Sequence, residues 1–267
     1  MIASYFSLRH LPFTQELPTC FFYTSPPFQE ALARLHYLLD TRGLGLLTGE
    51  IGAGKSSCLR ALSDQLDPAK NPILYFADSG LEPTGFYREV LQRCGVEPAK
   101  PRAEVRRQFQ SLFLDWHRHQ GKTALICLDE AHLLSPAMIQ EVRYLTNFGI
   151  DAGAPFACVL VGQPELRSLL RLKSLEAVTQ RITVRFHLAG LDLEQTAAYL
   201  QHQMTAAGAA RAVFEESAIR ALHAHTRGLP RLLNNFATAC LWDVAAHNQQ
   251  TVEEEHVQRV LAEFQQA

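Results

Sequence analysis

The sequence predicts an α/β protein: a parallel sheet with helices on both faces, followed by a smaller domain made only of helices. Over residues 29–188, short apolar runs alternate with longer stretches of helical spacing, and this alternation indicates a parallel sheet covered on both faces. From residue 189 onward, every segment has helical spacing and no buried-strand run recurs. We therefore expect domains at 29–188 and 189–267, preceded by a separate segment, 1–28.

Five apolar runs are predicted to form strands, and the amphipathic stretches between and after them are predicted to form helices. The expected strands lie at 44–47, 73–77, 123–128, 156–162 and 182–186. The expected helices lie at 28–41, 57–66, 83–94, 103–120, 136–148, 193–207, 215–226, 231–249 and 253–265. Ser25 and Ser135 are the expected N-caps of the helices that follow them.

Segment 1–28 is rich in aromatic residues and proline, which would not remain solvated on a free tail. Two interpretations stay open. The segment packs as a strap on one of the domains, or it forms a wall of an adenine pocket, and one segment could do both.

The composition is that of a globular protein. Of the 267 residues, 47% are hydrophobic and 19% are charged, which allows a sizeable core. A net charge of −2 supplies no overall field that attracts nucleic acid, so such binding needs a local basic patch or repeated subunits. The cysteines are scattered, and the N-terminus lacks a signal-peptide pattern. No apolar run approaches the roughly 20 residues of a membrane helix. We therefore expect a cytoplasmic protein without a membrane segment.

A phosphate-binding motif follows the first predicted strand. Residues 49–56 read Gly-Glu-Ile-Gly-Ala-Gly-Lys-Ser and match G-x-x-x-x-G-K-[ST] at every fixed position. Glycines let backbone N–H groups converge on phosphate oxygens, and the following helix adds its positive N-terminus. Lys55 is expected to reach the β- and γ-phosphates of ATP, and Ser56 to bind Mg²⁺. Unless this is a chance glycine-rich turn, the first domain binds a nucleotide through a P-loop.

The nucleotide-contacting residues that we expect fall in the motif, directly after it, and at one position of the helical domain. They are Gly49, Glu50, Gly52, Ala53, Gly54, Lys55, Ser56, Ser57 and Arg231.

The third predicted strand ends in two carboxylates. Asp129 is expected to hold Mg²⁺ directly or through water, and Glu130 to act as the general base for the attacking water. This pairing argues against a small-molecule kinase, because a kinase must exclude water. The alternative is a chance pair of acidic residues at a strand end.

Three further residues fit a hydrolase whose subunits complete each other's sites. Gln163 ends the next strand and could orient the water or sense the γ-phosphate, or it is a turn residue before Pro164. Arg231 lies in the first turn of a helix, where an arginine is disfavoured unless an anion is near; otherwise it is simply solvated. Arg181 is the preferred arginine finger for a neighbouring subunit, with Arg185 and Arg171 as alternatives and a surface ion pair as the simpler interpretation.

These motifs, in this order, carry a family resemblance over nearly the whole chain. Besides the phosphate loop, they include Tyr5-Phe6-Ser7-Leu8, Leu128-Asp129-Glu130-Ala131-His132, Val161-Gly162-Gln163-Pro164-Glu165, Gln180-Arg181-Ile182 and Gly228-Leu229-Pro230-Arg231. The chain resembles AAA+ ATPases of the ExeA/GspA type and, more distantly, the TnsC, TniB and MuB-like transposition ATPases. The resemblance implies sensor roles for Gln163 and Arg231, an arginine finger near Arg181, and ATP-dependent ring or helical homo-oligomers.

The resemblance is compatible with two cellular roles. Secretion-type members look longer, with a transmembrane segment and a cell-wall-binding domain, whereas this sequence stops after the helical domain. We therefore expect an ATPase that binds double-stranded DNA, recruits or activates a transposase, and hydrolyses ATP to reset the complex. A target-selection protein is a further expected partner. The alternative is an ATPase that supports assembly of a secretion or envelope complex.

A DNA-binding oligomer would need one basic strip per subunit. Candidates are Arg102, Arg106, Arg107, Arg118 and Lys122 before the Asp-Glu strand. His132 and Arg143, after that strand, could line a central channel of the oligomer. The simpler interpretation of the helix arginines is a solvated face. No base-reading element is evident, so binding to DNA would be largely independent of its sequence.

Overall fold

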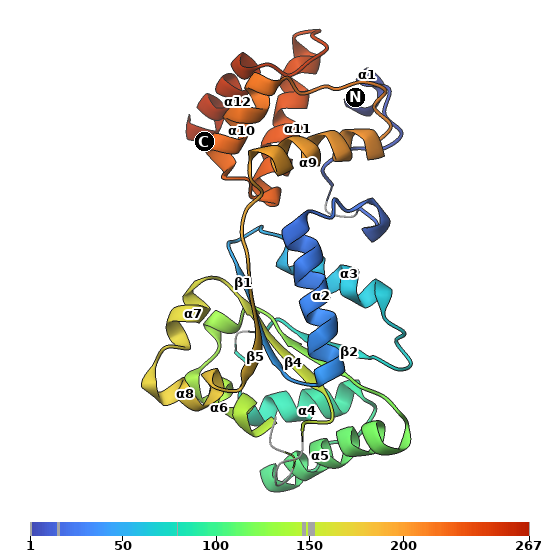
Figure 1. Cartoon of the computed structure of the whole chain (residues 1–267), viewed down its shortest axis with the longest axis vertical. Helices are drawn as coiled ribbons and strands as arrows, with labels where there is room; N and C mark the ends of the chain where they lie inside the picture. Colours follow the sequence, from blue (N-terminus) through green and yellow to red (C-terminus); the bar gives the residue numbers. More distant parts are fainter. Residues whose placement is uncertain (1, 15–16, 79, 146–147, 149–152, 267) are drawn as a thin grey trace. The chain divides into compact units, whose positions relative to one another are not determined.

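The computed structural model describes residues 2–14, 17–78, 80–145, 148 and 153–266. The chain divides into two compact units (Figure 1). The sheet unit comprises Glu30–Gly49 and Lys55–Leu188, and the helical unit comprises Met1–Gln29, Glu50–Gly54 and Ala189–Ala267. The phosphate loop is thus divided, since its central residues group with the helical unit and its two ends with the sheet unit.

The sheet unit contains a five-stranded sheet in the order β2-β3-β4-β1-β5, in which every neighbouring pair is parallel. The strands are β1 (Leu44–Gly49), β2 (Ile73–Phe76), β3 (Leu125–Leu128), β4 (Ala157–Gly162) and β5 (Ile182–Leu188). In the register, Leu128 lies opposite Leu160, and Thr48 opposite Gly162. The residues that follow β3, β4 and β1 therefore meet at one edge of the sheet, which positions the candidate site.

Helices cover both faces of this sheet, as the alternation of strands and helices predicts. They are α2 (Pro26–Thr41), α3 (Lys55–Gln65), α4 (Pro83–Arg93), α5 (Arg102–His119), α6 (Pro136–Leu145) and the short α7 (Glu165–Leu169) and α8 (Glu176–Thr179). On one face, Phe86 of α4, Phe109 of α5 and Met138 of α6 join the strands in one core. On the other, α2 approaches β1 so closely that a Cβ on Gly45 would lie 2.4 Å from Leu38 Cδ2.

The predicted element bounds need small corrections. β3 begins at Leu125 rather than at residue 123, because its pairing with β2 begins at Ile73, which lies opposite Leu125. α6 ends at Leu145 rather than near 148, and residues 146–147 lie outside the described part of the chain. The expected N-caps are confirmed: Ser25 Oγ accepts from Phe28 N at 3.3 Å, and Ser135 Oγ accepts from Met138 N at 3.2 Å.

The helical unit is built from α9 (Leu193–Ala206), α10 (Glu216–Thr226), α11 (Pro230–Ala246) and α12 (Glu254–Gln266), with α1 (Ile2–Tyr5) at the N-terminus. Asp192 caps α9 in a reciprocal capping box with Gln195. The N-terminal segment packs on this unit: the Tyr5 hydroxyl donates to Gln249 O at 2.8 Å, and the Phe13 ring lies 6.1 Å from the Phe214 ring. None of the described helices is long and apolar enough to cross a membrane.

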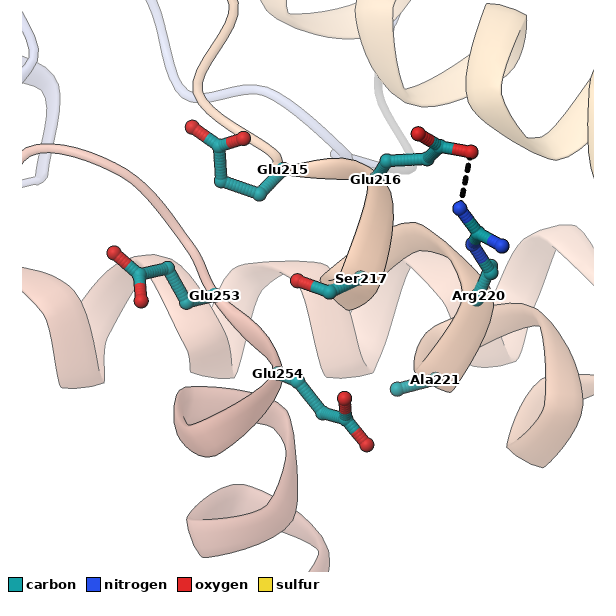
Figure 2. Close-up of a pocket in the computed structure, with 7 residues that line it drawn as sticks. All are labelled: Glu215, Glu216, Ser217, Arg220, Ala221, Glu253 and Glu254. Atoms are coloured by element: carbon teal, nitrogen blue, oxygen red, sulfur yellow. Dashed lines mark hydrogen bonds and ion pairs between the residues drawn. The ribbon is translucent and has the colours of Figure 1, made fainter.

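A concave surface of the helical unit carries strong negative charge (Figure 2). It is lined by Glu215, Glu216, Ser217, Arg220, Ala221, Glu253 and Glu254. Arg220 pairs with Glu216, which leaves the other three carboxylates as the dominant charge. This surface repels phosphate and therefore does not suit the backbone of DNA.

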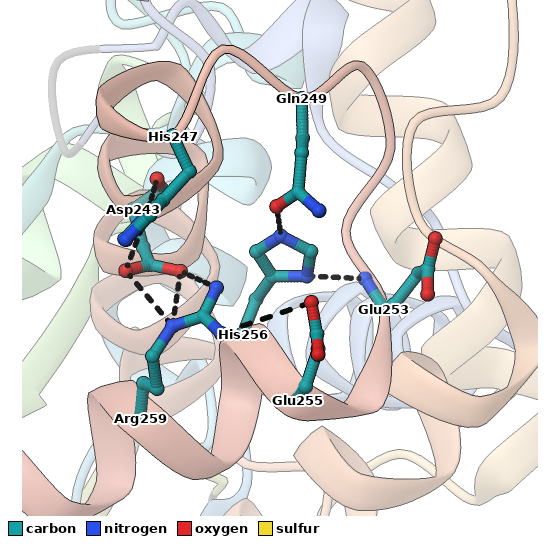
Figure 3. A network of polar contacts seen from close by, with 7 residues as sticks. All are labelled: Asp243, His247, Gln249, Glu253, Glu255, His256 and Arg259. Carbon is teal, nitrogen blue, oxygen red and sulfur yellow. Dashed lines mark hydrogen bonds and ion pairs between the residues drawn. The ribbon is translucent and has the colours of Figure 1, made fainter.

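Polar contacts near the C-terminus hold α12 against α11 and the preceding turn (Figure 3). His256 is fully buried, and its Nδ1 accepts from the Glu253 N–H at 3.0 Å, so the proton of a neutral ring lies on Nε2, which contacts the Gln249 side chain. Arg259 Nη2 of α12 lies 2.8 Å from Asp243 Oδ2 of α11. Because each buried polar group has a partner, the network stabilises the packing of these helices.

Candidate nucleotide site

The phosphate loop has the strand–loop–helix context that its motif requires. β1 ends at Gly49 and α3 begins at Lys55. Gly52 and Gly54 have φ values of +80° and +102°, in the left-handed region that glycine adopts without strain. The Ala53 N–H donates to Glu50 O at 3.1 Å and closes the turn. Ser56 and Ser57 lie in the first turn of α3, where backbone N–H groups can bind an anion.

Lys55 is buried although it carries a charge. The residue is 8% exposed, and its ammonium group donates to Gly49 O, at the end of β1, at 2.8 Å. A buried ammonium is costly unless hydrogen bonds and an opposite charge compensate it. The bond to Gly49 holds the side chain folded along the loop, where a bound phosphate would supply the negative charge.

Asp129 is also buried, and both of its carboxylate oxygens have donors. Oδ2 accepts from the Tyr75 hydroxyl at 2.5 Å, and Oδ1 accepts from the Glu130 N–H at 2.8 Å. Burial and the bond to Asp129 raise the pKa of Tyr75 above its usual value, which keeps the hydroxyl a donor. Together with the Ser56 hydroxyl, Asp129 offers hard oxygen ligands, the type that Mg²⁺ prefers. The residues present thus fit this ion.

Glu130 starts the short 3-10 turn Ala131–Leu133 in an unusual backbone conformation. Its φ of 50° and ψ of 33° are left-handed, which is strained for a residue with a side chain. The turn brings His132 back toward the strand ends. His132 Nδ1 lies 3.5 Å from Glu130 Oε2, and the same atom accepts from the Gln163 N–H at 3.5 Å. The structure thus brings together Glu130, His132 and Gln163 at the ends of β3 and β4.

Two contacts of this site escaped the sequence analysis. Tyr75 lies 54 positions from Asp129, and a tyrosine inside an apolar run gives no local sign of this contact. His132 is expected from the sequence to line a central channel, whereas its side chain is 8% exposed and lies against Glu130. The signal that could have found it is its spacing, two residues after the general base and within one tight turn.

Arg231 contacts the phosphate loop through its backbone. α11 begins at Pro230, and the Arg231 N–H donates to Gly52 O at 3.2 Å within the helical unit. A Cβ on Gly52 would lie 2.5 Å from Arg231 Cβ, so only glycine permits this approach. The Arg231 side chain is exposed, and its role toward a phosphate stays a prediction.

The candidate arginine fingers bind backbone carbonyls of their own subunit. Arg181 Nη1 donates to Arg143 O at 2.5 Å, and Arg185 Nη2 donates to Thr179 O at 2.6 Å. Arg171 is exposed after α7. The choice among the three, and any action on a neighbouring subunit, stays a prediction.

The residues expected to contact DNA do not share one environment. Arg106 lies 3.9 Å from the buried Glu141 carboxylate and 4.9 Å from the Tyr144 ring centroid, while Arg143 lies 5.5 Å from that centroid. Lys122 lies 5.5 Å from the Trp116 ring. Arg102, Arg107 and Arg118 are exposed on α5. The nearby carboxylate reduces the positive field of Arg106, which weakens the expected strip.

Comparison with known proteins supports an AAA fold for this part of the chain. Residues 38–170 match the family model of the AAA domain. Over these residues the chain has the AAA fold. General secretion pathway protein A of Aeromonas hydrophila is 33% identical over 237 residues, which cover 88% of this chain and 43% of that protein. This chain therefore spans less than half the length of that relative.

Solved structures share the AAA fold at low identity. Cdc6p from Pyrobaculum aerophilum superposes with a TM-score of 0.64 at 18% identity, covering 98% of this chain and 70% of that one. The ORC1 protein of Aeropyrum pernix in complex with DNA gives 0.67 at 17% identity, with 93% and 68% covered. At these identities the likeness shows the fold alone. It confirms the predicted P-loop sheet with helices on both faces, followed by a helical region.

Proposed function

We propose that this AAA domain binds ATP together with Mg²⁺ and hydrolyses it to ADP and phosphate. The observation that carries the proposal is the sheet edge where three strand ends meet. β1 leads into the loop before the buried Lys55, Asp129 and Glu130 directly follow β3, and Gln163 directly follows β4, which lies between β3 and β1. A phosphate-binding group and a general base at the same edge are what nucleotide hydrolysis requires.

Each residue has one role in this proposal. Lys55 binds the β- and γ-phosphates, while Ser56 and Asp129 hold the metal ion. Mg²⁺, when bound, supplies positive charge to the phosphate oxygens. Glu130 accepts the proton of the attacking water, and Gln163 orients that water or the γ-phosphate.

A pair of variants tests the hydrolysis proposal. Lys55→Ala should abolish nucleotide binding, measured with a fluorescent ATP analogue, since it removes the buried cation. Glu130→Gln should keep binding but lower phosphate release by about a hundredfold or more, because the amide cannot accept the proton. Glu104→Gln, an exposed carboxylate in the first turn of α5, is the matched control and should behave as the wild type. Normal turnover by Glu130→Gln would rule out Glu130 as the base.

For the cellular role, we infer that the ATPase supports assembly of a secretion or envelope complex. The 33% identity to general secretion pathway protein A favours this role. The second candidate is regulation of transposition on double-stranded DNA by a ring or helical homo-oligomer that recruits a transposase, with a target-selection protein as a further partner. A solved DNA complex with the same fold favours DNA binding, but at 17% identity.

DNA-stimulated hydrolysis separates the two roles. The ATPase rate and the oligomeric state should be measured with ATP, with and without random-sequence duplex DNA, at low and physiological salt. The secretion proposal expects no stimulation and no DNA-dependent oligomer. A several-fold faster hydrolysis together with oligomers on DNA, both lost when salt is raised, would favour the transposition role instead.

A further inference from the structure

The imidazole of His132 lies between two groups whose hydrogen-bonding needs conflict. Its Nδ1 is 3.5 Å from Glu130 Oε2 and 3.5 Å from the Gln163 backbone nitrogen. The carboxylate can only accept a hydrogen bond, and the backbone N–H can only donate one. A neutral imidazole nitrogen carries either a proton or a lone pair, so Nδ1 can serve one of the two groups at a time.

In the described structure, Nδ1 serves Gln163. The Gln163 N–H has hydrogen-bond geometry toward it, which requires the lone pair on Nδ1. Glu130 Oε2 is correspondingly buried without a hydrogen-bond partner, although the Glu130 side chain as a whole is 42% exposed. A buried carboxylate oxygen without a donor is costly, so this arrangement favours any change that places a proton on Nδ1.

The ring cannot relieve the conflict by moving away. The His132 side chain is 8% exposed. It also packs against the end of β4, since a Cβ on Gly162 would lie 3.3 Å from both the backbone nitrogen and Nδ1 of His132. Glycine at 162 leaves just enough room for the imidazole. Nδ1 can therefore change its hydrogen-bond partner by gaining or losing a proton, but not by a movement of the ring.

We propose that His132 is a positioning residue that couples Gln163 at the end of β4 to the general base Glu130. While the Gln163 N–H donates to Nδ1, His132 cannot donate a hydrogen bond from this atom to Glu130 Oε2. When a nucleotide draws Gln163 away, Nδ1 takes the proton that Nε2 gives up through solvent and donates it as a hydrogen bond to Glu130 Oε2. That bond fixes the carboxylate and leaves its other oxygen for the attacking water.

This inference rests on the proposed ATP hydrolysis, and matched variants separate the two. An asparagine amide reaches the position of Nδ1, whereas a glutamine amide reaches that of Nε2. His132→Gln and His132→Ala should therefore lower kcat by about ten- to a hundredfold with the KM for ATP unchanged, since a hydrogen bond to a charged group is lost. His132→Asn should retain most of the wild-type kcat. Gly162→Ala, which crowds the ring, should resemble His132→Gln.

A spectroscopic measurement tests the switch without using turnover. Long-range proton–nitrogen correlation spectra of ¹⁵N-histidine-labelled protein report which ring nitrogen carries the proton. The chain has 11 histidines, so the His132 signals are assigned by their loss in His132→Asn. Nδ1 should lack a proton in the nucleotide-free protein and carry one with Mg²⁺ and a non-hydrolysable ATP analogue. Lys55→Ala should show no change on addition of the analogue.

The possible outcomes separate the two proposals. If the wild type does not hydrolyse ATP, the proposed function fails, while the spectra still test the contact between His132 and Gln163 in the nucleotide-free state. If the wild type hydrolyses ATP and His132→Gln does so equally well, the positioning role is wrong and the hydrolysis proposal stands. An Nδ1 state that is the same with and without the analogue would also overturn the switch.

Discussion

Replacing Gly52 by alanine should disturb the contact between the phosphate loop and α11. Gly52 has a φ of +80°, and its carbonyl accepts the Arg231 N–H at 3.2 Å. An added Cβ would lie 2.5 Å from Arg231 Cβ, whereas carbon atoms in contact sit roughly 3.5–4.0 Å apart. Either the loop or the first turn of α11 must therefore move by about 1 Å or more.

The loss of free energy of unfolding in Gly52→Ala has two contributions. A left-handed alanine costs about 1–2 kcal/mol wherever it is placed. The displacement adds the loss of the Arg231 hydrogen bond, worth about 0.5–1.5 kcal/mol. Gly95→Ala isolates the first contribution, because Gly95 has a φ of +75° and its added Cβ would meet no atom within 4 Å.

Amide hydrogen exchange at Arg231 is the direct assay, since it reports on the bond itself without nucleotide. Loss of the bond should raise the exchange rate of this amide by roughly two- to tenfold in Gly52→Ala. The rate should stay at its wild-type value in Gly95→Ala. Equal Arg231 exchange in all three proteins would refute the inferred contact between the loop and α11.

Two further predictions concern buried polar groups. Burial raises the pKa of the Cys58 thiol to about 12, so at pH 8 only about one molecule in ten thousand carries the reactive Cys58 thiolate. A thiol reagent should therefore modify the exposed Cys20 first and Cys58 only after denaturation, as measured by peptide mass spectrometry. Equal rates of modification at the two cysteines would contradict this. The Tyr87 hydroxyl donates to the buried Glu141 carboxylate at 2.6 Å, so Tyr87→Phe should lower the free energy of unfolding by about 1.5–3 kcal/mol in urea titrations. Tyr37→Phe, at a side chain 59% exposed, should change it little, and an equal loss in both would refute the role of the bond.

Most of the fold followed from local patterns. Buried strands in a parallel sheet are continuous apolar runs, and those before Gly49, Asp129 and Gln163 marked β1, β3 and β4. The strand ends were less well predicted, as at β3, because hydrogen bonds to a distant segment decide where a ladder begins. The caps at Ser25 and Ser135 were predictable because a cap is a bond between residues three positions apart.

The candidate site likewise combines features that could be predicted from the sequence with features that could not. Glycine spacing and the adjacent lysine and serine are local, so the phosphate loop could be recognised without a structure. Arg231 was expected near a phosphate because an arginine at a helix N-terminus needs an anion, but the structure shows its backbone N–H on Gly52. The environment of the basic residues was not predictable: Glu141 lies beside Arg106 only because α5 and α6 pack on the same face.

Local sequence patterns were enough to predict the AAA fold, the order of its strands along the chain, and the phosphate loop with its downstream carboxylates. These features depend on residues close together in the chain, whose spacing sets backbone conformation and side-chain direction. The contacts that surround these carboxylates, in contrast, depended on the packing of the strands. Tyr75 reaches Asp129 from the neighbouring strand, and His132 links Glu130 to Gln163 across β3 and β4. The bonds from Tyr75 to Asp129 and from Gln163 to His132 join residues far apart in sequence, and only the pairing of strands brings their atoms within reach.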